Sequence, residues 1–376
     1  MSIYEKLGLK TGINACGTVT RLGGTRLSPE VCKAMDDAAK SFTPMHEFHR
    51  KAGEYIAGLL GVKACCITCG AAAGLAVVSA ACMTRGENSK VMQLPDTKGM
   101  PDEILMLKAH RIKYDQALLL SGAIIREVET TPAAAAPPAP EILNKMINNR
   151  TALFVYVAEN ESVCGSVPLP ELIPILKERG IPVLVDAAAE LPPAENIRSY
   201  LETGADLVVF SGGKEIRGPQ SSGLIVGDKE LIEACHANCC PNYSIGRSMK
   251  VSKENIAGLT AAVEHFINRD YNLQIKVWSE MSNRICESLG DRKDIKARVG
   301  YPTGPGIQPV IILRAYIKPL KLTAHRLQEK LINEPTPVYV DIYNDEIVLN
   351  PQCLEPEELE QLIEILHNCL NHNEDE

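Results

Sequence analysis

Short apolar runs that alternate with helical patterns constrain the fold of this chain more than any other feature. Between residues 62 and 226 these runs are almost entirely apolar, which indicates strands that are buried on both faces. Strands alternating with helices are typical of a parallel sheet covered by helices on both sides. We expect strands at residues 62–68, 90–94, 124–128, 151–158, 181–185, 208–210 and 224–226, and a helix at 102–109.

The chain has 376 residues, which is enough for one large domain and one smaller domain. We expect an N-terminal arm and helix at residues 1–45, a large α/β domain at 46–250 and a small α+β domain at 251–376. A long helical region at 254–289 links the two domains. The predicted fold class is therefore α/β, with a mainly parallel sheet and a small second domain.

A glycine-rich loop between two of the apolar runs carries a lysine. Ser211, Gly212 and Gly213 precede Lys214, so little side-chain bulk surrounds the amine and a flat ligand can approach it. A lysine at the apolar end of a strand can lose its water. The loss disfavours the ammonium form and makes the amine a nucleophile or a Schiff-base former. The alternative is an ordinary surface lysine.

Other polar groups also follow the apolar runs. Residues 69–74 form a tight turn of small residues before a helix, where backbone N–H groups and the helix dipole favour an anion. Asp186 and residues 159–162 follow two further runs. In a parallel sheet these ends share one edge, and ligands gather there. The alternatives are simple packing for the alanine-rich helix start and an N-cap or structural ion pair for Asp186.

Together these groups match what one cofactor requires. A lysine amine carries an aldehyde as a Schiff base, a carboxylate keeps a pyridine nitrogen protonated, and a helix start holds a phosphate. Lys214, Asp186 and residues 70–72 supply these functions, so we expect pyridoxal 5'-phosphate. Ser211 can add a hydroxyl to the phosphate site, and Ala188 is small enough to sit against the ring face.

On these residues the sequence resembles the fold-type I pyridoxal-phosphate enzymes. It is similar to the branch that holds bacterial selenocysteine synthase (L-seryl-tRNA(Sec) selenium transferase) and the D-glucosaminate-6-phosphate ammonia-lyases. The resemblance runs from residue 13 to about 265 and rests on the motifs at 17–24, 69–74, 183–188 and 211–220. It implies a mainly parallel seven-stranded-type sheet with helices on both faces.

The resemblance also implies roles for single residues. Lys214 corresponds to the Schiff-base lysine and Asp186 to the partner of the pyridine nitrogen, which makes both of them catalytic. The further cofactor-binding residues that it implies are Gly70, Ala71, Ala72, Ser211, Ala188, His110 and Gln220. Cys69 and Ala72 stand where many enzymes of this fold carry a hydroxyl, so backbone amides should bind more of the phosphate.

The expected activity is that of a lyase acting on a small amino acid, which can be phosphorylated or derived from a sugar. Lys214 removes the α-proton, a β-substituent leaves, and a keto acid and ammonia are released. Arg21, Arg26 and Arg247 are candidate ligands of the substrate carboxylate or phosphate. Racemase, aldolase and transaminase reactions use the same cofactor and remain alternatives. A selenocysteine synthase-like transferase and a scaffold for an RNA or protein partner are the others.

Charge and targeting signals bear on partners and location. The formal net charge is -8. Because the motifs begin at residue 13, we also expect the protein to lack the tRNA-binding N-terminal domain of bacterial selenocysteine synthases. We therefore expect no nucleic-acid partner. We expect a cytoplasmic protein without a membrane partner, because the sequence has no apolar signal core and no membrane-length apolar run. The resemblance implies a homo-oligomer, with Arg247 reaching the site from a partner subunit.

The cysteines and histidines do not predict a metal site. The 13 cysteines show no zinc-type spacing and are expected to be small buried hydrophobes in a reducing compartment. His46 and His49 lie three residues apart on a predicted helix, but the sequence places no third ligand near them.

Overall fold

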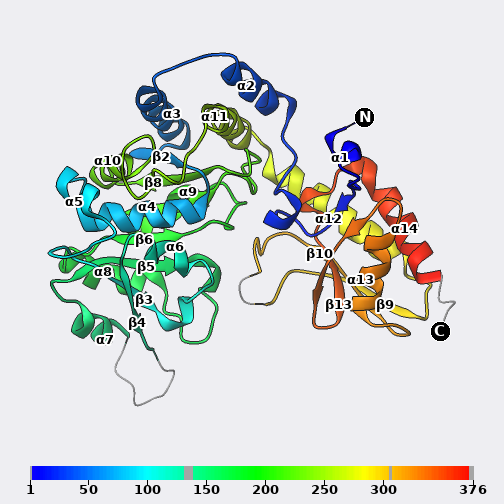
Figure 1. Cartoon of the computed structure of the whole chain (residues 1–376). Coiled ribbons are helices and arrows are strands. Elements are labelled where there is room, and N and C mark those ends of the chain that lie inside the picture. The colour runs from blue at the N-terminus through cyan, green and yellow to red at the C-terminus, as the bar shows by residue number, and fades with distance from the viewer. Residues whose placement is uncertain (1, 131–138, 305–306, 372–376) are drawn as a thin grey trace. The chain divides into compact units, whose positions relative to one another are not determined.

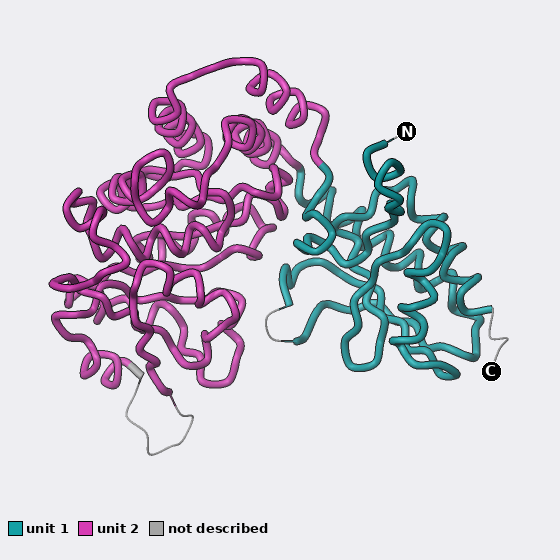
Figure 2. Tube along the Cα trace, viewed as in Figure 1, with its two compact units in different colours: residues 1–26, 270–376 teal, residues 27–269 magenta. Residues whose placement is uncertain are grey.

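The computed structural model describes residues 2–130, 139–304 and 307–371. The chain forms two compact units, which Figure 2 shows in different colours. Unit 2 is Leu27–Arg269, and unit 1 combines Met1–Arg26 with Asp270–Glu376. These boundaries differ from the expected division at residues 45 and 250. Helix α11 (Lys253–Ile267) packs against α2 (Pro29–Ala39) and α3 (Met45–Leu60), and so all three helices belong to unit 2.

Within the described residues, unit 2 is built on a seven-stranded sheet with the order β2-β8-β7-β6-β5-β3-β4 (Figure 1). Strand β8 runs antiparallel to both of its neighbours, and the other adjacent pairs are parallel. The predicted mainly parallel sheet is thereby confirmed. The strands are β2 (Ala64–Thr68), β3 (Glu103–Leu107), β4 (Ile124–Val128), β5 (Thr151–Val157), β6 (Val183–Asp186), β7 (Leu207–Ser211) and β8 (Gly223–Gly227).

Helices cover both faces of this sheet (Figure 1). On one face, α4 (Ala71–Thr84) and α10 (Lys229–Asn238) share a core with alternate residues of the strands. Strands β5 and β8 are buried at every residue, so the opposite face is covered as well. The other helices are α5 (Asn88–Gln93), α6 (Asp115–Leu119), α7 (Ala139–Met146), α8 (Leu169–Glu178) and α9 (Asn196–Thr203). In the described part of the chain, no helix has both the length and the apolar character to cross a membrane.

Two elements differ from the sequence prediction. Residues 90–94 fall largely in helix α5 and not in a strand, and residues 102–109 contain strand β3 and not a helix. All five residues of β3 are buried, and the strand pairs with β4 on one side and β5 on the other. A short apolar run has no periodicity that would separate a buried strand from a buried helix. The two predictions were wrong for that reason.

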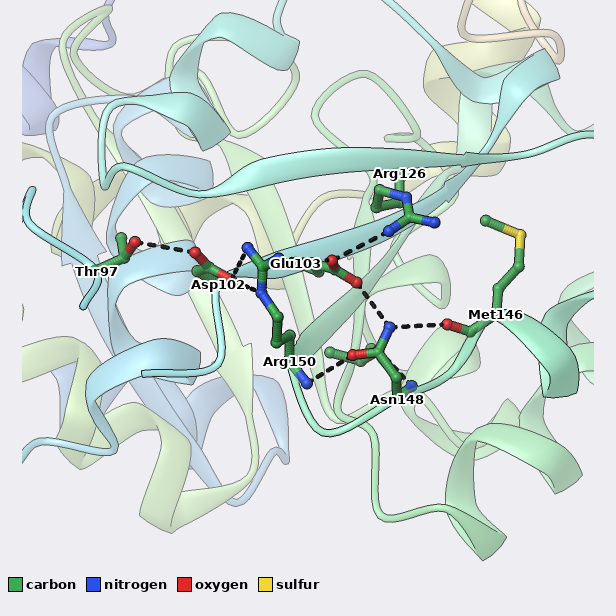
Figure 3. Close-up of polar contacts among 8 residues, drawn as sticks. Thr97, Asp102, Glu103, Arg126, Met146, Asn148 and Arg150 are labelled. Carbon is green, nitrogen blue, oxygen red and sulfur yellow. Dashed lines mark hydrogen bonds and ion pairs between the residues drawn. The ribbon is translucent and has the colours of Figure 1, made fainter. Parts of the chain in front are cut away.

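A network of polar side chains surrounds the start of β3 (Figure 3). The Glu103 side chain is buried, and its carboxylate accepts hydrogen bonds from Arg126 at 3.1 Å and from Asn148 at 2.8 Å. The guanidinium of Arg150 donates to the buried Asp102 through Nε at 2.9 Å and lies 3.4 Å from Glu103. The network joins the start of β3 to β4 and to the segment that leads into β5. It also satisfies two buried carboxylates.

Unit 1 is a small α+β unit, as expected. In its described residues, an antiparallel sheet has the order β12-β13-β10-β9, and a short parallel pair joins β1 to β11. Trp278 is buried in the core between this sheet and the helices. The elements are α1 (Ile3–Lys6), β1 (Ile13–Asn14), α12 (Tyr271–Ser288), β9 (Ile295–Gly300), β10 (Arg314–Pro319), α13 (Ala324–Asn333), β11 (Val338–Tyr339), β12 (Asp341–Tyr343), β13 (Glu346–Leu349) and α14 (Leu359–Asn371).

We expect Glu103→Ala to lower the free energy of unfolding of unit 2 by about 2 kcal/mol, because its three polar partners lose a buried acceptor. Urea unfolding followed by circular dichroism measures the change. Glu129→Ala is the matched control, because that carboxylate pairs with Lys108 at 2.7 Å where both side chains are exposed. The control should change stability by less than about 0.5 kcal/mol. Equal losses in the two variants would contradict a stabilising role for the buried network.

Candidate active site

The carboxyl ends of three neighbouring strands bring the predicted lysine together with acidic side chains. Lys214 follows β7, Asp186 is the last residue of β6, and Glu159 follows β5. Strand β6 pairs with both β5 and β7 in parallel, so these ends share one edge of the sheet. The charge of Lys214 interacts there with Asp186, Glu159 and Glu190.

The loop that carries Lys214 needs glycines for its close packing. A Cβ atom at Gly213 would lie 2.5 Å from the Cα of Gln220, and one at Gly212 would lie 2.3 Å from Ser222 Oγ. Burial lowers the pKa of Lys214, and the three nearby carboxylates oppose this change only in part. The amine is therefore closer to its neutral, nucleophilic form than a solvated lysine is.

Asp186 is buried at the end of β6, and its carboxylate accepts a hydrogen bond from the Ala188 N–H at 3.1 Å. Burial raises the pKa of Asp186, and the Ala188 amide and Lys214 lower it. A further positive group at this carboxylate, such as a protonated ring nitrogen, would favour the ionised form in the same way.

Sequence reasoning places Glu159 at this edge without giving it a role, and Glu190 is a further acidic residue there that it did not single out. Glu190 is 9% exposed, and its Oε1 has no hydrogen-bond partner among the described residues. Burial and then the charge of Glu159 raise the pKa of Glu190 to about 7. Burial also raises the pKa of Glu159. Glu190 follows Asp186 by four residues, and an acid so close to a strand end is a signal that could have identified it.

The turn at residues 70–72 forms the start of α4. Gly70 is the N-cap residue of α4, with a φ of +145°, and as a glycine it has no side chain to cap the first turn of the helix. Cross-strand pairing puts Thr68, Gly223 and Ser211 in one row over β2, β8 and β7. A Cβ atom at Gly223 would lie 2.6 Å from the carbonyl carbon of Gly70 and 2.9 Å from the Ala71 nitrogen. Glycine therefore lets β8 approach the helix start closely, which brings Ser211 towards the same N–H groups.

These residues fit the predicted cofactor. The uncapped start of α4 and Ser211 would hold the phosphate, the desolvated Lys214 would bind the aldehyde, and Asp186 would face the ring nitrogen. The buried Oε1 of Glu190, which has no partner in the described residues, calls for a donor that a bound ligand can provide.

His110 follows β3, and β5 separates that strand from β6, which carries Asp186. Its Nδ1 accepts the N–H of Val157 at 3.0 Å, and Val157 pairs with Asp186 across β5 and β6. Nε2 therefore carries the proton and donates to Ser166 Oγ at 2.8 Å. Burial lowers the pKa of His110 to about 4, so the ring is neutral at physiological pH. Gln220 is exposed in the lysine loop. The cofactor contacts of His110 and Gln220 stay predictions.

The three arginines have different surroundings. Arg21 and Arg26 belong to unit 1, where they pair with Asp341 at 2.6 Å and with Glu358. Arg247 is exposed in the segment after α10 and lines a surface cavity of about 410 Å³ in unit 2. Their proposed roles in substrate binding stay predictions.

The architecture is that of a fold-type I pyridoxal-phosphate enzyme, a fold that solved structures of low sequence identity also have. The family model for L-seryl-tRNA selenium transferase matches residues 13–355. The chain therefore belongs to this family. The resemblance that the motifs suggested is confirmed.

Known proteins of different activities are similar to the chain. It is 36% identical over 270 residues to a D-glucosaminate-6-phosphate ammonia lyase of Salmonella typhimurium, a match that covers 70% of each chain. It is 37% identical over 267 residues to a 5'-C-glycyluridine monooxygenase-decarboxylase of a Streptomyces species, covering 70% of this chain and 65% of that protein. A solved structure of D-glucosaminate-6-phosphate ammonia-lyase superposes over 100% of both chains with a TM-score of 0.85 and 29% identity.

We expect Gly223→Ala to weaken the binding of pyridoxal phosphate by at least about tenfold. The new Cβ would be too close to the backbone of Gly70 and Ala71 and would displace the start of α4. Fluorescence titration of cofactor-free protein with pyridoxal phosphate measures the change. Gly58→Ala is the control, because a Cβ at that helical glycine would contact nothing within 4 Å. Unchanged affinity in Gly223→Ala would contradict the phosphate site at this helix start.

Glu190→Gln should make cofactor-free protein more stable than wild type as the pH rises. The pKa of Glu190 is about 7 in the folded chain and near 4.3 in an unfolded chain. Folding is therefore disfavoured increasingly between these values, and the penalty is complete above the folded pKa. The urea unfolding midpoints of wild type and Glu190→Gln should therefore differ less at about pH 5 than at about pH 8. Glu195→Gln, at an exposed position in the same segment, should give no such divergence.

Proposed function

We propose that the protein is a pyridoxal-phosphate-dependent lyase that releases ammonia and a keto acid from a small 2-amino-3-hydroxy acid, phosphorylated or derived from a sugar. One observation carries the proposal: a partly buried lysine among three buried or partly buried carboxylates stands on the same sheet edge as the start of helix α4. The similarity to D-glucosaminate-6-phosphate ammonia-lyase over the whole chain supports the choice of reaction.

Each residue of the site has a task in this proposal. When bound, pyridoxal phosphate supplies an aldehyde that condenses with amines and a ring that withdraws electrons from the α-carbon. Lys214 Nζ accepts the α-proton, because burial favours its neutral form. Glu190 can carry a proton to the departing hydroxyl, because its pKa of about 7 leaves it partly protonated near neutral pH. Asp186 provides the fixed negative charge at the end of β6.

The overall reaction is balanced without an oxidant. The substrate loses its α-proton and its β-hydroxyl, which leave as water. The enamine that results becomes an imine, and one water molecule then releases ammonia and leaves a 2-keto-3-deoxy acid. Arg21, Arg26 and Arg247 are the proposed ligands of the substrate carboxylate or phosphate, since a guanidinium binds both groups with two hydrogen bonds.

A substrate panel tests the function. D-Glucosaminate-6-phosphate, its unphosphorylated form, serine and threonine are incubated with holoenzyme, and ammonia and keto acid are measured. We expect turnover of the phosphorylated sugar acid and a loss of at least about 100-fold in Lys214→Ala. Lys229→Ala, at an exposed lysine of α10, is the matched control. Borohydride reduction should fix the cofactor to Lys214 in the wild type.

Other results of the panel would replace the proposal. Loss of optical activity without release of ammonia would indicate a racemase. Release of an aldehyde would indicate an aldolase. Formation of keto acid only when an amino-group acceptor is present would indicate a transaminase. Oxygen uptake with carbon dioxide release on a glycyl nucleoside would match the Streptomyces relative. Tight, salt-dependent binding of seryl-tRNA would favour the transferase reaction after which the family is named. Protein that binds no cofactor and is not labelled at Lys214 would exclude all the cofactor-dependent activities.

We also propose that the protein is cytoplasmic and forms a homo-oligomer. All 13 cysteines lie in the described residues and all are free thiols, which suits a reducing compartment. Phe42 is fully exposed and lines the same surface cavity as Arg247, and an exposed aromatic side chain of this kind is typical of subunit interfaces. Light scattering during gel filtration measures the oligomeric state, and a monomer at micromolar concentration would contradict it.

A further inference from the structure

A second group of reactive side chains is buried in unit 2, apart from the residues assigned to the lyase reaction. His49 on α3, Cys66 on β2 and His236 on α10 place one ligand atom each within 4.8 Å of one another. All three side chains are buried. Cys239, directly after α10, lies beside them. The fold thus supplies the further ligands near His49 that the sequence does not show.

Two of the distances that involve Cys66 are those of ligands around a single ion. Cys66 Sγ lies 3.7 Å from Cys239 Sγ and 3.8 Å from His236 Nδ1. In a tetrahedral zinc site with Zn–S bonds of about 2.3 Å, two sulfur ligands stand about 3.8 Å apart, and a sulfur and an imidazole nitrogen stand about 3.6 Å apart. Both distances match a pair of ligands on one ion. Cys239 is not among the three residues whose ligand atoms all lie within 4.8 Å of one another, so its side chain would turn towards the two histidines when an ion binds.

Backbone carbonyl groups orient both imidazole rings. His49 Nε2 lies 2.6 Å from the carbonyl oxygen of Ile67, and the His236 ring forms a hydrogen bond to the carbonyl of Cys65. These carbonyls belong to the two residues that flank Cys66 on β2. A ring that donates one N–H to a carbonyl presents its other nitrogen as a lone pair, and metal-binding histidines almost always have such an arrangement.

We propose that His49, Cys66, His236 and Cys239 form a structural zinc site. Two nitrogen and two sulfur ligands in a tetrahedron are typical of structural zinc. Each thiol releases its proton to solvent as its sulfur binds the ion, so two thiolates balance the charge of the dication. The neutral result suits the apolar surroundings of Cys66 and Cys239.

The ion would join three elements around the strand that leads into the phosphate turn. Cys66 precedes Thr68 by two residues on β2, and α4 starts three residues after Thr68. Ligands from α3 and from the end of α10 would hold β2 on the side of α10. The site would thus fix the position of the helix start that the proposed function uses. The metal content is measured without any enzyme turnover, so the zinc site is tested independently of the proposed lyase activity.

Elemental analysis of purified holoenzyme tests the proposal. We expect about one zinc ion per chain in wild type and a loss of at least about tenfold in Cys66→Ser and in His236→Gln. Cys65→Ser and His46→Gln are the matched controls. Cys65 is the buried neighbour of Cys66 on the same strand, and His46 is an exposed residue of the helix that carries His49. Both controls should retain the metal. Equal losses in control and test variants would overturn the assignment.

Cobalt replacement in wild-type protein gives a result that does not depend on the folding of a variant. Zinc is removed with a chelator under reducing conditions, and Co²⁺ is added to the holoenzyme. We expect the intense visible bands of tetrahedral cobalt with thiolate ligands, and their disappearance when zinc is returned. The proposal would be overturned if wild-type protein contains no zinc and the added cobalt gives only the weak spectrum of a six-coordinate ion. A disulfide between Cys66 and Cys239 in protein purified without reductant would overturn it too.

Discussion

The strand-end edge of unit 2 depends on the balance between one partly buried amine and three carboxylates. Removing Lys214 from water favours its neutral form, and the charges of Asp186, Glu159 and Glu190 favour the ammonium. Neither effect cancels the other, so the amine is less basic than in water but remains attracted to acids on neighbouring strands. Because the acids are themselves partly desolvated, small changes in bound charge can move protons among these groups.

Much of the fold follows from the sequence, because the strands of a covered parallel sheet are nearly continuous apolar runs. The runs that become β5, β6 and β7 were located correctly, since polar turns and helical patterns bound each of them. The segment around β3 was not, because an isolated apolar run fits a buried helix equally well. Only its pairing with β4 and β5 decides between the two, and pairing is a property of the tertiary structure.

The site was predictable where local sequence carries the chemistry. A glycine-flanked lysine after one strand and an aspartate at the end of another can be recognised in isolation, and the structure puts both on one edge. The raised pKa of Glu190 could not be predicted, because it results from burial beside Glu159, which belongs to a different strand end. The His49 and Cys66 group shows the same limit. Its ligands come from α3, β2 and α10, and their spacing along the chain resembles no metal motif.

The reversed direction of β8 has a mechanical consequence. The sheet is otherwise parallel, so most loops at its carboxyl edge leave one strand and pass into a helix on one face. The lysine loop instead returns to the same edge, and Ser211 and Gly223 at its two ends are paired with each other. Gly212 and Gly218 add a backbone bridge of 2.8 Å within it. The loop is therefore a closed ring on a rigid base, and a molecule bound to Lys214 is held to the whole sheet and not to a mobile chain segment.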